Sequence, residues 1–246
     1  MITGNVLVNT LIDELNDMGL SNMAAALDTM YHSEQFLKKD HLTLLSDLIA
    51  PEYENKISKR FLNHLKHAHL SGCPQELINC VDTKTREYLP NGITTVLGTM
   101  HFIDNGLNVC LLGPSDSGKT YLAKALAIAA CRQHNVEYHH CEELLEKLVS
   151  LKEKDYDKYL RKIKLLTKLD LLILDDFLLN TITDEREIKI LFALQEKRLE
   201  AAKSTMVCSQ REPKSWASMI LNDEVASNAI MKRATKHYTV VINMKY

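Results

Sequence analysis

The feature that most constrains this chain is the segment NVCLLGPSDSGKTYLAKALAIAA at residues 108–130. A short apolar run is followed by the spacing Gly113-x4-Gly118-Lys119-Thr120 and then by an alanine-rich stretch with helical periodicity. A strand that passes through a glycine-containing turn into a helix presents backbone N–H groups and the helix N-terminus to an anion. The spacing therefore predicts a buried strand, a phosphate-binding loop and a helix in direct succession.

We predict that this loop binds ATP, that Lys119 reaches the β- and γ-phosphates and that the Thr120 hydroxyl ligates Mg²⁺. A glycine-containing turn without a ligand is the alternative. Asp116 stands where many such loops have glycine, and a carboxylate beside a triphosphate is unfavourable unless it points to solvent. The residues expected to hold ATP are Gly113, Pro114, Ser115, Asp116, Ser117, Gly118, Lys119, Thr120 and Tyr121.

A second apolar run, LDLLILDD at residues 169–176, ends in two acids. An uninterrupted apolar run is typical of a strand buried on both faces, and open α/β sheets bind ligands at the carboxyl ends of such strands. We therefore expect Asp175 to hold Mg²⁺ through water and Asp176 to orient or polarise the water that attacks ATP. Two acids that only cap the following loop are the alternative.

Two further residues are candidates for catalysis beside Lys119 and Asp176. Gln210 follows the apolar segment STMVCS, which we expect beside the loop strand, so its side chain can touch the γ-phosphate or the attacking water. Arg233 lies in NAIMKRATKHY, and its fixed charge and planar guanidinium suit a residue that reaches a nucleotide from a neighbouring subunit. The alternatives are a plain turn after the strand and an ordinary surface arginine.

The pattern of apolar residues changes near residue 95. Residues 5–70 show mainly helical spacing, and turn-forming residues in 71–94 indicate a linker. Beyond them, apolar strand segments alternate with longer helical segments, which indicates a parallel sheet with crossover helices. We predict an α/β fold in which residues 1–94 form a small all-helical N-terminal domain with its linker and residues 95–246 form the ATP-binding domain.

Composition limits the location and the partners. No apolar run reaches the roughly 18 residues of a membrane span, the N-terminus lacks the basic region of a secretion signal, and the six cysteines form no C-x-x-C pair. We therefore expect a cytoplasmic protein with reduced thiols and no membrane partner. Because the net charge is −2, DNA contacts have to come from local basic surfaces, for which residues 152–168 and 56–69 are candidates. Solvated helices are the alternative for both.

The adjacent residues His139, His140 and Cys141 are of the types that bind metals. Neighbouring residues of a strand point to opposite faces, however, and we identify no second cluster of such residues to complete a site. We therefore expect no metal site at this triplet.

The order of these segments resembles a known family. LLGPSDSGKTYLAKALA, LDLLILDD, STMVCSQREPKSW and NAIMKRATKHY are similar, in this order, to segments of the IstB-like transposition-helper ATPases, which are close relatives of the DnaC-type helicase loaders within the AAA+ class. MGLSNMAAALDTMY and FIDNGLNVCLLGP resemble the same family, so the resemblance covers nearly the whole chain. It implies a P-loop AAA+ core whose parallel sheet is flanked by helices.

The resemblance also implies a working cycle. Subunits bind ATP at their interfaces, assemble into a ring or spiral on duplex DNA and recruit a partner transposase, and hydrolysis resets the assembly. By matching position, the phosphate and metal residues are Lys119, Thr120 and Asp175, the water residue is Asp176, the sensor is Gln210, and the arginine that reaches a neighbour's nucleotide is Arg233.

Three residues depart from the family pattern: Asp116, Leu178 where glycine is frequent, and Lys232 where an acid is common. Because the loop and metal residues are intact, we expect ATP binding; the three departures bear on the efficiency of hydrolysis, and Asp116 bears also on the strength of ATP binding. The nearest rival function is a DnaC-type helicase loader that acts on a ring helicase and single-stranded DNA. A small-molecule P-loop kinase and a non-hydrolysing DNA-binding module are two further candidate functions.

Overall fold

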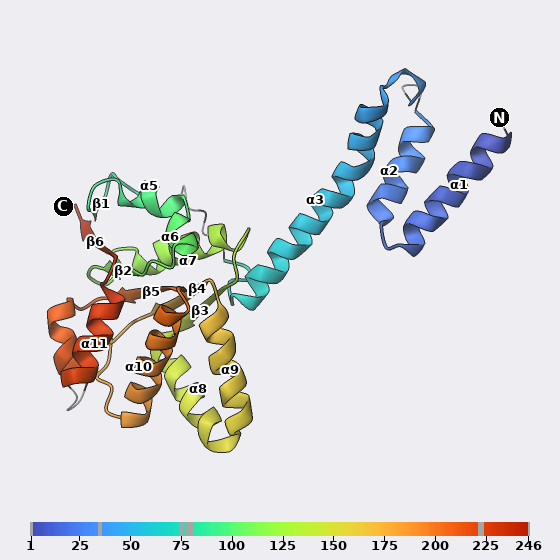
Figure 1. Ribbon diagram of the computed structural model, residues 1–246. Helices are drawn as coiled ribbons and strands as arrows, with labels where there is room; N and C mark the ends of the chain where they lie inside the picture. The colour runs from blue at the N-terminus through green and yellow to red at the C-terminus, as the bar shows by residue number, and fades with distance from the viewer. Residues whose placement is uncertain (1, 34–35, 74–75, 77–80, 221–223, 246) are drawn as a thin grey trace. The chain divides into compact units, whose positions relative to one another are not determined.

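The computed structural model describes residues 2–33, 36–73, 76, 81–220 and 224–245, and the chain divides into two compact units, residues 1–63 and 64–246. The described part of the first unit consists of α1 (Ile2–Asp17), α2 (Ser21–Tyr31), the 3₁₀ helix η1 (Phe36–Lys38) and most of α3 (His41–His67) (Figure 1). Gly19 has a φ of 73°, which ends α1 in a tight turn and brings α2 back against it. The buried carboxylate of Glu52 in α3 accepts two hydrogen bonds from Asn22 and fastens α3 to α2.

The second unit is built on a six-stranded sheet in the order β1-β6-β2-β5-β4-β3. All neighbouring strands are parallel except β1, which pairs antiparallel with β6. This arrangement confirms the predicted α/β fold. The strands are β1 (Arg86–Leu89), β2 (Val109–Leu112), β3 (Val136–His140), β4 (Leu171–Asp175), β5 (Ser204–Ser209) and β6 (Tyr238–Met244).

Helices cover both faces of this sheet (Figure 1). α7 and the short helices α5 and α6 lie on one face, and α8 to α11 form a layer on the other. Alternate side chains of the central strands, among them Leu112 of β2 and Leu174 of β4, enter the core between the sheet and the layer α8 to α11. Because helices cover the other face as well, β2, β4 and β5 are buried at every residue. The helices are α5 (Ile93–Gly98), α6 (His101–Asp104), α7 (Lys119–Ala130), α8 (Cys141–Lys154), α9 (Tyr156–Lys168), α10 (Glu185–Glu200), the 3₁₀ helix η2 (Pro213–Met219) and α11 (Glu224–Ala234).

The strand β1 has no recognisable sequence pattern, because a four-residue segment becomes a strand only through its partner β6, which lies about 150 residues further along the chain. The compact units divide between Asn63 and His64, so residues 64–94 lie in the unit that contains the sheet. A domain boundary near residue 95 stays a prediction. Within the described ranges, no helix combines the length and the apolar character needed to cross a membrane.

Candidate nucleotide-binding site

The loop between β2 and α7 is shaped by two glycines that no other residue could replace without a shift. A Cβ atom on Gly113 would lie 2.5 Å from the carbonyl oxygen of Ile242 in β6. Gly118 has a φ of 96°, and a Cβ atom there would lie 3.1 Å from Nε of Arg86. The loop therefore lies close first to β6 and then to β1 before α7 begins at Lys119.

Lys119 is buried and folds back over this loop. Its Nζ donates hydrogen bonds to the carbonyl oxygens of Gly113 and Pro114, at 2.9 and 2.7 Å. Burial lowers the pKa of Lys119, and the nearby carboxylates of Asp175 and Asp176 oppose that shift. The ammonium group is thus confined beside the loop and available to an anion that enters it.

The hydroxyl of Ser117, also in this loop, is buried and has no hydrogen-bond partner among the described residues. An orphaned buried hydroxyl next to a lysine and to the N-terminus of a helix is a cost for the protein alone, and a phosphate oxygen can remove it. The loop therefore has the donors that an anion requires.

The two acids at the end of β4 have different surroundings. Asp175 is 1% exposed, and its carboxylate accepts a hydrogen bond from the hydroxyl of Tyr138 at 2.5 Å and one from the N–H of Asp176 at 2.9 Å. Asp176 is partly exposed, has a φ of 52°, and lies 3.1 Å from Nδ1 of His140. Tyr138 and His140 are alternate residues of β3, so one face of that strand holds both carboxylates.

Gln210 is exposed and directly follows β5. β5 pairs with β2, the loop strand, as the sequence predicted, and its other neighbour is β4. Parallel strands end at the same edge of a sheet, so the structure brings Gln210 to the edge that also has the loop and the two acids. The structure thus brings four predicted residues to one edge of the sheet: Asp175 and Asp176 at the end of β4, Gln210 after β5, and Lys119 at the start of α7.

Arg233 does not join this group within its own chain. Its guanidinium group lies 4.3 Å from the ring centroid of Phe192 and 3.3 Å from Oε1 of Glu196, both in α10. Its carbonyl oxygen accepts a hydrogen bond from Asn108, which precedes β2 at the sheet edge opposite the loop. Arg233 therefore lies away from the loop between β2 and α7 of its own chain.

Arg86, Tyr138 and His140 are site residues that the sequence did not predict. The Nε atom of Arg86 is buried beside Gly118 and has no hydrogen-bond partner among the described residues, and Nη1 lies 3.6 Å from Asp82. No local signal marks these residues, because each reaches the site only through strand pairing. The predicted residue Tyr121, in the first turn of α7, is 59% exposed.

Two of the three departures occupy left-handed backbone positions. Asp116 is exposed with a φ of 60°, and Leu178 is buried with a φ of 53°. Glycine meets the least resistance in this conformation, and Asp accepts it better than most residues. The third departure, Lys232, lies exposed on α11.

Comparisons with known proteins agree with this geometry. The family described as IstB-like ATP binding protein matches residues 13–245. Among curated proteins, the insertion sequence ATP-binding protein y4pL of Sinorhizobium fredii is 29% identical over 229 residues, which are 93% of this chain and 91% of that protein.

Solved structures show the same fold in distant proteins. AMPPCP-bound DnaA from Aquifex aeolicus is 21% identical with a TM-score of 0.55; the match covers 69% of this chain and half of DnaA. The DnaC helicase loader is 19% identical with a TM-score of 0.50, over 62% of this chain and 89% of the loader. At such identities the likeness concerns the fold, which is that of AAA+ P-loop domains.

Proposed function

This chain belongs to the family of IstB-like ATP-binding proteins of the AAA+ class, and from this premise we propose that it is an ATPase that assembles on duplex DNA and assists a partner transposase. The observation that carries the proposal is the convergence of Lys119, Asp175 and Asp176 at one edge of the sheet, beside a loop whose carbonyl oxygens accept hydrogen bonds from Lys119. The names of relatives such as y4pL place those proteins in insertion sequences.

The loop residues Gly113 to Tyr121 would hold ATP, with Lys119 exchanging its two loop carbonyls for phosphate oxygens. The hydroxyl of Thr120 and the carboxylate of Asp175 are oxygen donors, the type that Mg²⁺ prefers, so the residues fit this ion. When bound, Mg²⁺ supplies charge neutralisation at the phosphates. Asp176, which is partly exposed and close to His140, would orient the attacking water, and Gln210 would contact the γ-phosphate.

DNA binding is supported by a basic hollow within the second unit. Three cationic residues of α9, Arg161, Lys164 and Lys168, line it together with His64 and His67. Tyr159, Ile163 and Leu166 bury the opposite side of α9 in the core, so the three cationic side chains lie on its exposed side. They fit the phosphates of a DNA backbone, which bind Lys and Arg without sequence preference and with strong salt dependence. Residues 152–168 contribute the three cations of this hollow, and residues 56–69 contribute its two histidines.

In an assembly, Arg233 would contact the nucleotide bound by a neighbouring subunit. Its own loop is at the opposite edge of the sheet, so a nucleotide contact by Arg233 requires a second subunit. A DnaC-type helicase loader is the second candidate function, favoured by the shared fold with the DnaC loader. The two differ in the DNA that they require, because the loader acts with single strands.

The test is steady-state ATP hydrolysis with no DNA, with long duplex DNA and with single-stranded DNA, for the native chain and for Lys119→Ala. We expect hydrolysis that duplex DNA stimulates and that Lys119→Ala abolishes. Stimulation by single strands alone would favour the loader. Absence of hydrolysis under all three conditions would overturn the ATPase proposal and favour the non-hydrolysing module.

A further inference from the structure

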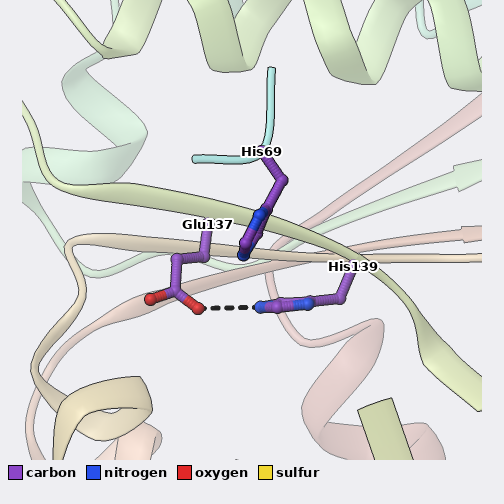
Figure 2. A group of neighbouring side chains, drawn as sticks. All are labelled: His69, Glu137 and His139. Atoms are coloured by element: carbon purple, nitrogen blue, oxygen red, sulfur yellow. Dashed lines mark hydrogen bonds and ion pairs between the residues drawn. The ribbon is translucent and has the colours of Figure 1, made fainter. Parts of the chain in front are cut away.

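Three potential metal ligands converge on the outer edge of the sheet (Figure 2). Glu137 and His139 are alternate residues of β3, the edge strand, and point to the same face, while His69 approaches them from the segment that follows α3. One ligand atom from each lies within 4.8 Å of the other two. Nε2 of His139 is 2.7 Å from Oε2 of Glu137, and the rings of His69 and His139 are 5.2 Å apart.

The backbone fixes His69 in this position. α3 ends with hydrogen bonds from Ala68 to His64 and from Leu70 to Leu65, and the N–H of Tyr138 in β3 bonds to the carbonyl oxygen of Ala68 at 3.1 Å. His69 itself has a φ of 59°, a conformation in which glycine is the usual residue at a helix end. The backbone conformation therefore does not favour histidine over glycine at this position, and we look to the contacts of the imidazole for the reason that histidine is there.

Neutral imidazole and an ionised carboxylate are the forms that bind metals, so a cation beside the carboxylate competes with a metal for it. Glu137 is 7% exposed, and its carboxylate is also 2.8 Å from Nζ of Lys162. Lys162 competes with a metal for this carboxylate. Its long flexible side chain can withdraw into the adjoining open hollow, which it lines together with His69 and Lys147.

We propose that His69, Glu137 and His139 bind a divalent transition metal, with Zn²⁺ as the best match, and leave a fourth position to water. Two imidazoles and one carboxylate are a ligand set that zinc accepts in proteins, whereas Mg²⁺ prefers oxygen alone. The bound metal would join the segment after α3 to β3. Because Tyr138 and His140 on the other face of β3 hold Asp175 and Asp176, the metal would also hold in place the strand that positions these acids.

His139 and His140 face opposite ways, as the alternation of side chains along a strand predicts, since His140 pairs with Asp176 and His139 with Glu137. The expectation that no further ligands complete a site did not include His69 and Glu137, which lie next to His139 in the structure. Glu137 has an ordinary place in a strand, and His69 lies 70 residues before His139 in the chain.

The test is a titration of the full-length, chelator-treated chain with Co²⁺, followed by visible absorption, in excess Mg²⁺ to occupy the nucleotide site. We expect one equivalent of Co²⁺ with ligand-field bands, displaced by one equivalent of Zn²⁺. His69→Ala and His139→Ala should each weaken binding by about 100-fold or more, because loss of a direct ligand exceeds the usual effect of an outer partner. His140→Ala is the matched control and should bind Co²⁺ as the native chain does.

Two conservative variants keep the test decisive if an alanine variant fails to fold. Glu137→Gln preserves shape and should weaken Co²⁺ binding, whereas Lys162→Met removes the competitor and should strengthen it. Circular dichroism confirms folding of each variant. Binding that none of the three ligand substitutions changes, or absence of binding in both the native chain and Lys162→Met, would show a hydrogen-bonded cluster without a metal role.

Discussion

At the scale of single residues, the nucleotide loop depends on side chains that accept unusual surroundings. Lys119 is buried, Ser117 has a buried hydroxyl without a partner among the described residues, and Asp116 has left-handed backbone geometry. Each arrangement costs free energy in the absence of a ligand, and a bound triphosphate would compensate for the first two. Asp116 differs, since its charge opposes the triphosphate while its backbone conformation suits Asp.

The charge of Asp116, and not its conformation, should therefore limit nucleotide affinity. Asp116→Asn keeps a residue that tolerates a φ of 60°, and Asp116→Gly removes the side chain altogether. We expect both to bind ATP more tightly, by about threefold to tenfold, with little change in stability, because one exposed like charge near the phosphates is removed. Fluorescent-nucleotide titration at low and high salt measures this. Equal affinity of all three chains would show that Asp116 points away from the nucleotide.

The positions of the loop and of the acids after the buried strand could be predicted from sequence, and the residues that support them could not. Spacing alone placed Lys119 and Asp175, because a phosphate loop and a buried strand have local signatures. Tyr138 contacts Asp175 across 37 residues, and Arg86 reaches Gly118 only because β1 joins β6. Such contacts follow from strand order, which no local pattern determines.

At the scale of elements, one arginine connects three of them at the sheet edge opposite the nucleotide loop. Arg198 of α10 is 1% exposed, and its guanidinium donates to the carbonyl oxygens of Leu166, Leu169 and Ser204 and to the hydroxyl of Thr205. These acceptors end α9 and begin β5. The planar fork of arginine suits several acceptors at once, which lysine cannot match.

Arg198→Met should therefore destabilise the second unit by about 3 kcal/mol or more, because several buried carbonyl oxygens lose their donor. Arg198→Lys should recover only part of this loss. Urea unfolding followed by circular dichroism measures it, and Arg186→Met on the exposed start of α10 is the control, expected to leave the midpoint near that of the native chain. A native midpoint for Arg198→Met would contradict the role assigned to this residue.

Asp170, just before β4, is expected to make the free energy of unfolding fall at acid pH. Burial alone would raise its pKa, but hydrogen bonds from Lys203 and from the N–H of Asn135 outweigh burial and lower the pKa below its usual value. The folded pKa is below the unfolded one, so the stabilisation is complete above the unfolded pKa and is lost as pH falls through the folded pKa.

Asp170→Asn should accordingly lower the free energy of unfolding by about 1 kcal/mol at pH 7. The difference between variant and native chain should shrink as the pH falls from about 5 to about 2. Urea midpoints across this range measure it, with Asp157→Asn in the first turn of α9 as the control. A difference that does not depend on pH would contradict the assignment.

At the scale of the whole molecule, the position of Arg233 decides whether it can contact the nucleotide of its own chain or only that of another subunit. Within one chain it packs on Phe192 and Glu196, away from the loop. If it acts on nucleotide, it acts on that of another subunit.

Mixed subunits test this directly. Lys119→Ala and Arg233→Ala should each reduce hydrolysis by about 100-fold or more, and a mixture of the two should recover part of the activity, because some interfaces then combine an intact loop with an intact arginine. Glu196→Gln, which breaks the intrachain pair but keeps Arg233, should retain activity. A mixture no more active than its components would place Arg233 in a structural role.

The most direct test of the central claim is the mass of the complex that the protein forms on long duplex DNA, measured by sedimentation with ATP, with ADP and without nucleotide. We predict complexes of several subunits on duplex DNA that require ATP and the side chain of Lys119. Complexes of the same mass in all three nucleotide conditions, or assembly on single-stranded DNA alone, would contradict an ATP-dependent assembly on duplex DNA.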